Sequence, residues 1–105
     1  MSNPCIVIAT FYPAAGDFEA VRDAIRAVTP DVHREDGCEL YALHEETEGR
    51  LVLIEKWTTR ELWQEHLTLE PVKRLRASLT GLVESETEVL EMYGSPAGTP
   101  EQGSL

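Results

Sequence analysis

The sequence predicts an α+β protein with the βαββαβ element order of a ferredoxin-like fold and an antiparallel sheet. Four short segments have the alternating or continuous apolar pattern that is typical of strands. Between them, apolar residues recur at every third or fourth position, as on one face of a helix. Glycine, proline and polar turn residues separate the segments. The order of these patterns along the chain predicts the fold class.

The first strand and the first helix are expected in the N-terminal third of the chain. Residues 5–12, CIVIATFY, have the composition of a strand that is apolar on both faces. Residues 13–16 form a turn, and Asp17 is suited to cap the helix that follows. Gly37 suits the positive φ at which a helix ends. The helix spans about four turns, because one apolar stripe runs through Phe18, Val21, Ile25, Val28 and Val32.

A hairpin is expected next, with strands over residues 40–45 and 51–57 and a polar loop between them. The sequence leaves the register of this hairpin open. One register places His44 on the face that carries Glu55, and a shift of one residue places Tyr41 beside Glu55 instead. The register therefore decides which of these two rings faces the same side as the acid.

The C-terminal half completes the pattern. Residues 58–61, TTRE, have the spacing of a capping box and open a second helix. This helix carries Leu62, Trp63, His66 and Leu67. Pro71 suits the first turn of a third helix, and residues 86–92 alternate as a final strand. The stripe of the third helix is Val72, Leu75, Leu79 and Leu82. We assign residues 1–93 to one domain and 94–105, rich in proline and glycine, to a C-terminal tail.

The sheet is expected to be apolar on both faces, although helices cover only one face in this fold. Ile6 and Ile8, with Val52 and Ile54, or the alternate set, would be left as an exposed apolar surface. Stacking that face on a second copy removes the exposure, so we expect a homodimer. The alternative is that the tail covers this face within one chain.

Composition narrows the class of function. The chain has 105 residues and a net charge of −10, which argues against nucleic acid and against an anionic membrane surface as partners. No apolar run approaches the ~20 residues of a membrane span, and no basic-then-apolar signal segment opens the sequence. Cys5 and Cys38 are too few for a disulfide scaffold and are expected to be buried, reduced thiols. A cytoplasmic protein fits these features.

Two aromatic side chains and an acid are the first candidates for chemistry. Trp57 ends the third strand beneath the second helix, where it either lines a pocket or fills the core. His66 shares the inner side of its helix and, as a neutral imidazole, is able to accept a phenolic proton. Its structural alternative is a hydrogen bond to backbone or to Glu55. A buried Glu55 must be paired or protonated, with His66, Tyr41 or Arg76 as its expected partner and a structural tether as the favoured role.

Other polar residues are less favoured as functional candidates. Arg76 either turns inward to an anionic substrate oxygen or extends to solvent. His44 is expected at the surface or the pocket rim, and His33 complements the dipole at a helix end. The sequence has no phosphate-binding glycine loop, dinucleotide fingerprint, catalytic triad or metal-ligand spacing. We therefore expect neither a cofactor nor a metal.

The segment Glu35–His44, with Glu55-Lys56-Trp57 and then His66, resembles the antibiotic biosynthesis monooxygenase family over about residues 6–92. Members are small dimeric α+β barrels, and they include quinol oxygenases that use no cofactor. The resemblance implies a monooxygenase that acts on a quinol or another hydroxyaromatic molecule, with dioxygen as the second substrate. An electron-rich anion then reduces dioxygen directly in a dry, apolar cavity.

The resemblance also implies roles for particular side chains. His66 would transfer the proton, Trp57 and Trp63 would stack on the substrate, and Glu55 or Tyr41 would orient it. The apolar wall would consist of Val7, Ala9, Phe11 and Leu53.

The sequence departs from the family's patterns at specific positions. Leu53 stands where members that act on polyketides have asparagine. The haem-degrading branch uses asparagine, tryptophan and histidine where this chain has Ala9, His66 and Arg76, so haem degradation is a minor alternative. A dimeric binding or stress-response module without turnover is the principal alternative, since a fold alone does not fix function.

Overall fold

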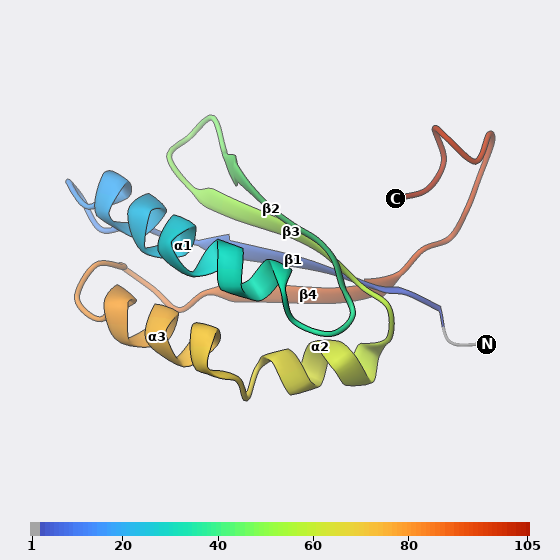
Figure 1. Cartoon of the computed structure of the whole chain (residues 1–105). Coiled ribbons are helices and arrows are strands. Elements are labelled where there is room, and N and C mark those ends of the chain that lie inside the picture. The colour runs from blue at the N-terminus through green and yellow to red at the C-terminus, as the bar shows by residue number, and fades with distance from the viewer. Residues whose placement is uncertain (1–2) are drawn as a thin grey trace.

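The computed structural model describes residues 3–105 as a four-stranded antiparallel sheet with three helices on one face (Figure 1). The strands are β1 (Cys5–Phe11), β2 (Cys38–Glu45), β3 (Leu51–Trp57) and β4 (Glu88–Tyr93). The helices are α1 (Phe18–His33), α2 (Arg60–His66) and α3 (Glu70–Leu79). The strand order β2-β3-β1-β4 confirms the ferredoxin-like α+β fold, with the second helical segment divided into α2 and α3.

Several element boundaries differ from the expected ones by one or two residues. Strand β2 begins at Cys38, and β4 begins at Glu88. The N-cap of α2 is Thr59 rather than the first residue of the TTRE segment, and its hydroxyl accepts a hydrogen bond from the Leu62 N–H. Asp17 occupies the N-cap position of α1 but makes no capping hydrogen bond with its side chain. The predicted helix starts are therefore right to within a residue, while one capping partner is wrong.

The structure resolves the register of the β2–β3 hairpin. Tyr41 pairs with Glu55, so both side chains lie on the helix-covered face, and His44 pairs with Val52 on the opposite face. A β-bulge between Cys38 and Leu40 shifts the register at the start of β2. The register with Tyr41 beside Glu55 is the correct one, and His44 is exposed on the far side of the sheet.

The core lies between the sheet and the apolar faces of α1 and α3, which run side by side over it (Figure 1). The buried α1 residues are those of the expected stripe, Val21, Ile25, Val28 and Val32. Gly37 has φ +82°, as predicted, and a Cβ atom there would lie 2.6 Å from Leu62 Cδ1. A glycine therefore lets the loop after α1 approach α2 closely.

The other face of the sheet is only partly covered. The C-terminal tail folds back near one end of it, where Lys56 Nζ donates a hydrogen bond to the Leu105 carbonyl 2.8 Å away. Ile6 is buried there, whereas Ile8, Val52 and Ile54 are half-buried. Strand β4, at the sheet edge, is exposed along its whole length. Within residues 3–105 no helix is long and apolar enough to cross a membrane.

Candidate functional site

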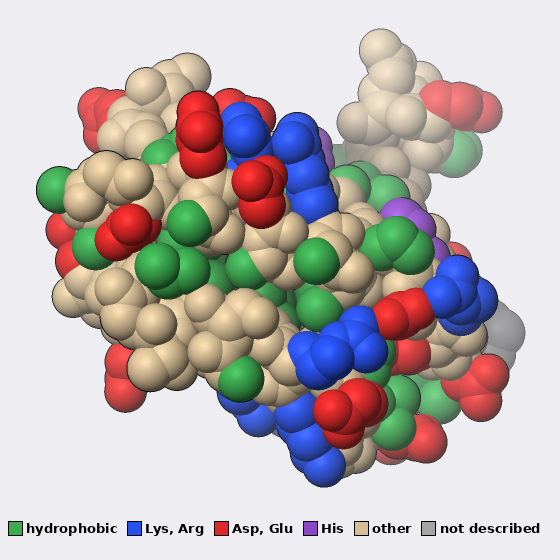
Figure 2. All heavy atoms as spheres, turned by 60° about the vertical axis from the view of Figure 1, so that its left-hand side comes forward, with side chains coloured by type: hydrophobic (Ala, Val, Ile, Leu, Met, Phe, Trp, Pro, Cys, Tyr) green, Lys and Arg blue, Asp and Glu red, His purple; other side chains and the backbone are tan. Residues whose placement is uncertain are grey.

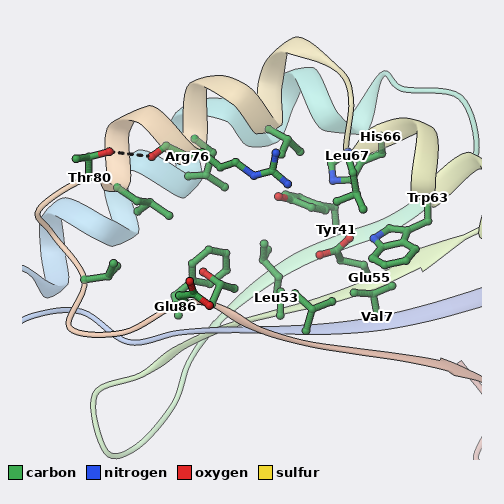
Figure 3. A pocket seen from close by; sticks show the side chains of 18 residues that line it. Val7, Tyr41, Leu53, Glu55, Trp63, His66, Leu67, Arg76, Thr80 and Glu86 are labelled. Atoms are coloured by element: carbon green, nitrogen blue, oxygen red, sulfur yellow. Dashed lines mark hydrogen bonds between the residues drawn. The ribbon is translucent and has the colours of Figure 1, made fainter.

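A cavity of about 550 Å³ lies between the sheet and the helices α2 and α3 (Figure 3). It is large enough for a small aromatic ligand. The residues that the sequence assigned to substrate binding all line it: Ala9, Phe11, Tyr41, Leu53, Trp63 and Arg76. Glu55 and His66 line it as well. Strand alternation brings Ala9, Phe11, Tyr41 and Leu53 to one face of the sheet. Trp63 on α2 and Arg76 on α3 belong to the opposite wall.

His66 lies at the polar end of the cavity and is bonded to a carboxylate that the sequence did not single out. Its Nδ1 lies 2.6 Å from Oε1 of Glu35, which belongs to the loop between α1 and β2. Their side chains are only 4% and 7% exposed. The partner is thus neither backbone nor Glu55, the two that the sequence favoured. Within residues 3–105, Glu35 Oε2 is buried without a hydrogen-bond partner.

Burial controls the protonation of this pair. It lowers the pKa of His66 to about 4, and the nearby Arg76 charge acts in the same direction. It also raises the pKa of Glu35 to about 7. The imidazole is therefore uncharged at neutral pH, and the carboxyl group is close to half-ionised. A neutral imidazole is the form able to accept a proton from a ligand.

Two aromatic rings fix the orientation of the His66 imidazole. Trp57 lies against it with ring centroids 4.5 Å apart and an angle of 35° between the planes. Tyr41 meets it edge-on at 5.8 Å. Trp57 is fully buried and is not among the cavity-lining residues, so it supports His66 from behind. Its side chain therefore contacts the site residues and not the open space beside them.

Glu55 projects into the cavity from β3 (Figure 3). Its Oε1 accepts a hydrogen bond from Trp57 Nε1 at 2.9 Å, so its partner is Trp57 and not the expected His66, Tyr41 or Arg76. Burial raises the pKa of Glu55 to about 7; the Trp57 hydrogen bond opposes the rise, and the Glu35 charge adds to it. One buried carboxyl group, Glu55, thus lines the cavity, and another, Glu35, contacts His66. Their negative charge in the ionised form makes the cavity unfavourable for an anionic ligand.

Arg76 extends from α3 into the cavity, which is one of the two orientations that the sequence left open. Figure 3 shows its guanidinium group and the Tyr41 hydroxyl pointing toward each other. Arg76 takes part in none of the ion pairs that join residues 3–105. Burial and the charges of Glu55 and Glu35 raise the pKa of Tyr41, so its hydroxyl stays protonated. A cation and a neutral hydroxyl thus face the same space.

The remaining lining is largely apolar. It includes Val7, Leu67, Val72, Leu75, Leu79, Val83 and Val89. Figure 2 shows hydrophobic side chains in the middle of the face drawn, with acidic and basic side chains around them. Glu86 and Thr80 line the end away from His66 (Figure 3). The site therefore combines an apolar body with a proton acceptor and a cation at one end.

The other histidines lie outside this site. His33 Nε2 is 3.1 Å from the Tyr41 carbonyl oxygen, and His44 Nδ1 is 3.0 Å from the Ala42 carbonyl oxygen. Among residues 3–105, no three His, Cys, Asp or Glu side chains form a group that could hold a metal ion. Cys5 is buried and Cys38 is partly buried, and neither forms a disulfide.

Glu35 is the residue that sequence reasoning missed. It follows a helix that ends two residues earlier, and its partner lies 31 residues away along the chain. No periodicity links such positions. The only local signal is Gly37, whose missing Cβ allows the Glu35 loop to approach α2.

Comparison with known proteins places the chain in a family. The model of the antibiotic biosynthesis monooxygenase family matches residues 4–78. The Mycobacterium tuberculosis protein named "Putative monooxygenase Rv0793" is 37% identical over 67 residues, which span 63% of this chain and 66% of that protein.

Solved structures agree with this match. The structure of Rv0793 aligns with a TM-score of 0.81 and 30% identity, over 92% of this chain and 98% of that one. PA3566 from Pseudomonas aeruginosa aligns with a TM-score of 0.81 and 27% identity, over 89% and 95% of the two chains. A Nitrosomonas europaea structure described as a putative antibiotic biosynthesis monooxygenase shares the fold, with a TM-score of 0.83 at 18% identity. The resemblance seen in the sequence is confirmed: the chain belongs to the antibiotic biosynthesis monooxygenase family.

Proposed function

We propose that this protein is a monooxygenase that needs no bound cofactor and acts on a quinol or another hydroxyaromatic molecule. One observation carries the proposal: a buried, uncharged imidazole and a cation meet at one end of an apolar cavity. A neutral molecule with an acidic hydroxyl group fits this arrangement, because Glu55 lines the cavity and Glu35 contacts His66 beside it. A flat aromatic body fits the apolar walls that surround it.

The first step is removal of the hydroxyl proton. His66 accepts it, and the resulting phenolate oxygen is stabilised by the Arg76 guanidinium and the Tyr41 hydroxyl. Trp63 lines the cavity and offers a stacking surface, while Trp57 acts as a positioning residue through His66. Glu55, directed into the same space, orients the substrate as a hydrogen-bond donor in its protonated form.

The second step is electron transfer from the anion to dioxygen. One oxygen atom forms a bond to a ring carbon, and the other leaves as water with the two hydrogen atoms that the substrate loses. A phenol thereby becomes a quinone, and a quinol becomes a hydroxyquinone. The substrate supplies both electron pairs, and the protein supplies a dry site, a base and a fixed cation.

We also propose that the active form is a homodimer. Ile8, Val52 and Ile54 lie on the sheet face away from the helices and are only half-buried. A second copy stacked on that face would bury them. Sedimentation at dilutions down to nanomolar concentration tests this assembly, and a monomer at all concentrations overturns it.

The function is tested by oxygen consumption with a panel of naphthols and quinols. We expect turnover that is unchanged by chelator or added flavin, and one atom of ¹⁸O₂ in the product. His66→Ala should reduce kcat strongly, whereas Gln64→Ala, which changes an exposed residue of the same helix, should not. Binding of these ligands without turnover above the uncatalysed rate would overturn the proposal and favour the binding-module alternative.

A further inference from the structure

The contact between Glu35 and His66 does more than fill the core. Nδ1 and Nε2 lie on opposite sides of an imidazole ring, so the 2.6 Å contact of Nδ1 with Glu35 turns Nε2 away from that carboxylate. No hydrogen bond joins Nε2 to another residue within 3–105, while the His66 side chain lines the cavity. Nε2 is therefore the nitrogen available to a ligand.

The hydrogen-bond partner of one ring nitrogen sets the state of the other. An ionised Glu35 is an acceptor only, so it requires a proton on Nδ1. Nε2 of the neutral ring then carries a lone pair. If the acid were replaced by a group that donates to Nδ1, the proton would move to Nε2 and the cavity would meet a donor instead of a base.

Glu35 is also incompletely compensated. Its Oε2 is buried without a partner among residues 3–105, and its side chain is only 7% exposed. A buried anion with a single hydrogen bond favours a positive charge beside it. Transfer of a proton to Nε2 creates that charge on the imidazole, and the ionised Glu35 in contact with Nδ1 stabilises it.

The other charged and titratable groups around the imidazole do not provide this stabilisation of a protonated His66. Glu55 on β3 is held by Trp57, and Tyr41 on β2 and Cys38 at the start of β2 are uncharged. Arg76 on α3 opposes protonation of the ring. Glu35 is the carboxylate in direct contact with the imidazole.

We infer that Glu35 in its ionised form is a positioning residue for proton transfer: it holds His66 with Nδ1 protonated and Nε2 free toward the cavity, and it stabilises the imidazolium formed there. The mechanistic part of this inference rests on the proposed function. The tautomer of His66 does not, because it is a property of the folded protein alone.

The test combines a spectroscopic and a kinetic measurement on the full chain. In ¹⁵N NMR of the wild-type protein above pH 8, we expect His66 to carry its proton on Nδ1. Glu35→Gln should shift the proton toward Nε2, because the amide is able to donate to Nδ1. With an oxidisable hydroxyaromatic, Glu35→Gln should lower kcat by roughly 10²–10⁴-fold, the scale seen when a triad carboxylate is made an amide, and KM should change only a few-fold.

Asp36→Asn is the matched control, because Asp36 is an acid of the same loop and its side chain is exposed. It should leave the His66 tautomer and kcat unchanged. A wild-type His66 with its proton on Nε2 would overturn the inference, as would a Glu35→Gln protein with unchanged kcat and pH profile. If the wild-type protein oxidises no hydroxyaromatic, the proposed function fails, and the wild-type tautomer alone decides the role of Glu35.

Discussion

Glu55→Gln should stabilise the protein increasingly as pH rises. Burial raises the pKa of Glu55 from 4.5 to about 7, so the folded protein keeps a proton that the unfolded chain releases. Stability from this group is present below pH 4.5 and is lost as pH rises toward 7. At about 1.4 kcal/mol per pKa unit, the full loss is about 3 kcal/mol. Glutamine mimics the protonated acid, and its oxygen still accepts the Trp57 hydrogen bond.

Urea unfolding at pH 5 and pH 8.5 measures this effect. The free energy of unfolding of Glu55→Gln relative to wild type should increase by about 2–3 kcal/mol between the two pH values. Glu45→Gln, an exposed acid on the neighbouring strand, should show no such increase. A difference between Glu55→Gln and wild type that is the same at both pH values would refute the buried, protonated state of Glu55.

Three further perturbations test other parts of the structure. In thermal unfolding, Gly37→Ala should destabilise the fold by about 1–3 kcal/mol more than Gly49→Ala. Both glycines have positive φ, but of the two only Gly37 lacks space for a Cβ. Equal losses of stability in the two variants would contradict the close approach of this loop to α2. Arg76→Gln should lower kcat/KM for hydroxyaromatics by about 10–100-fold, which corresponds to the loss of a charge-assisted hydrogen bond. Arg74→Gln, on the same helix but ion-paired at the surface, should not lower it. If the two variants have similar kinetics, Arg76 does not contact the substrate. Burial lowers the pKa of His66 from 6.5 to about 4, so the unfolded chain takes up a proton on this residue before the folded protein does. Wild type should therefore lose stability relative to His66→Gln as pH falls from 6.5 to about 4. If urea unfolding gives the same difference in free energy between the two proteins over this range, the ring is not buried in its uncharged form.

The apolar wall of the cavity was predictable because strand alternation determines sheet faces. Ala9 and Leu53 pair across β1 and β3, so both face the helices. The choice between Tyr41 and His44 was not predictable in the same way. Both residues belong to one strand, and the polar loop after it fits either register. The bulge between Cys38 and Leu40 belongs to the register that the protein adopts, and bulges leave little trace in a sequence.

The polar contacts of the site could not be predicted from the sequence for a different reason. A helical or strand pattern shows which side of an element is inward, and this brought His66, Glu55 and Trp57 to the same region. It does not show which atoms meet there. Trp57 bonds Glu55 on its own strand, and Glu35 reaches His66 from a loop, so both pairs depend on side-chain geometry. Contacts of this kind become visible only in three dimensions.

The bulge at the start of β2 has an evolutionary consequence. From Tyr41 onward β2 is paired in regular register with β3, while the bulge adjusts only the segment that enters the strand. Deleting one residue there would leave the cavity wall in place and withdraw Glu35 from His66. Proteins that share this scaffold could therefore exchange one proton-transfer arrangement for another through a single codon, without rebuilding the pocket.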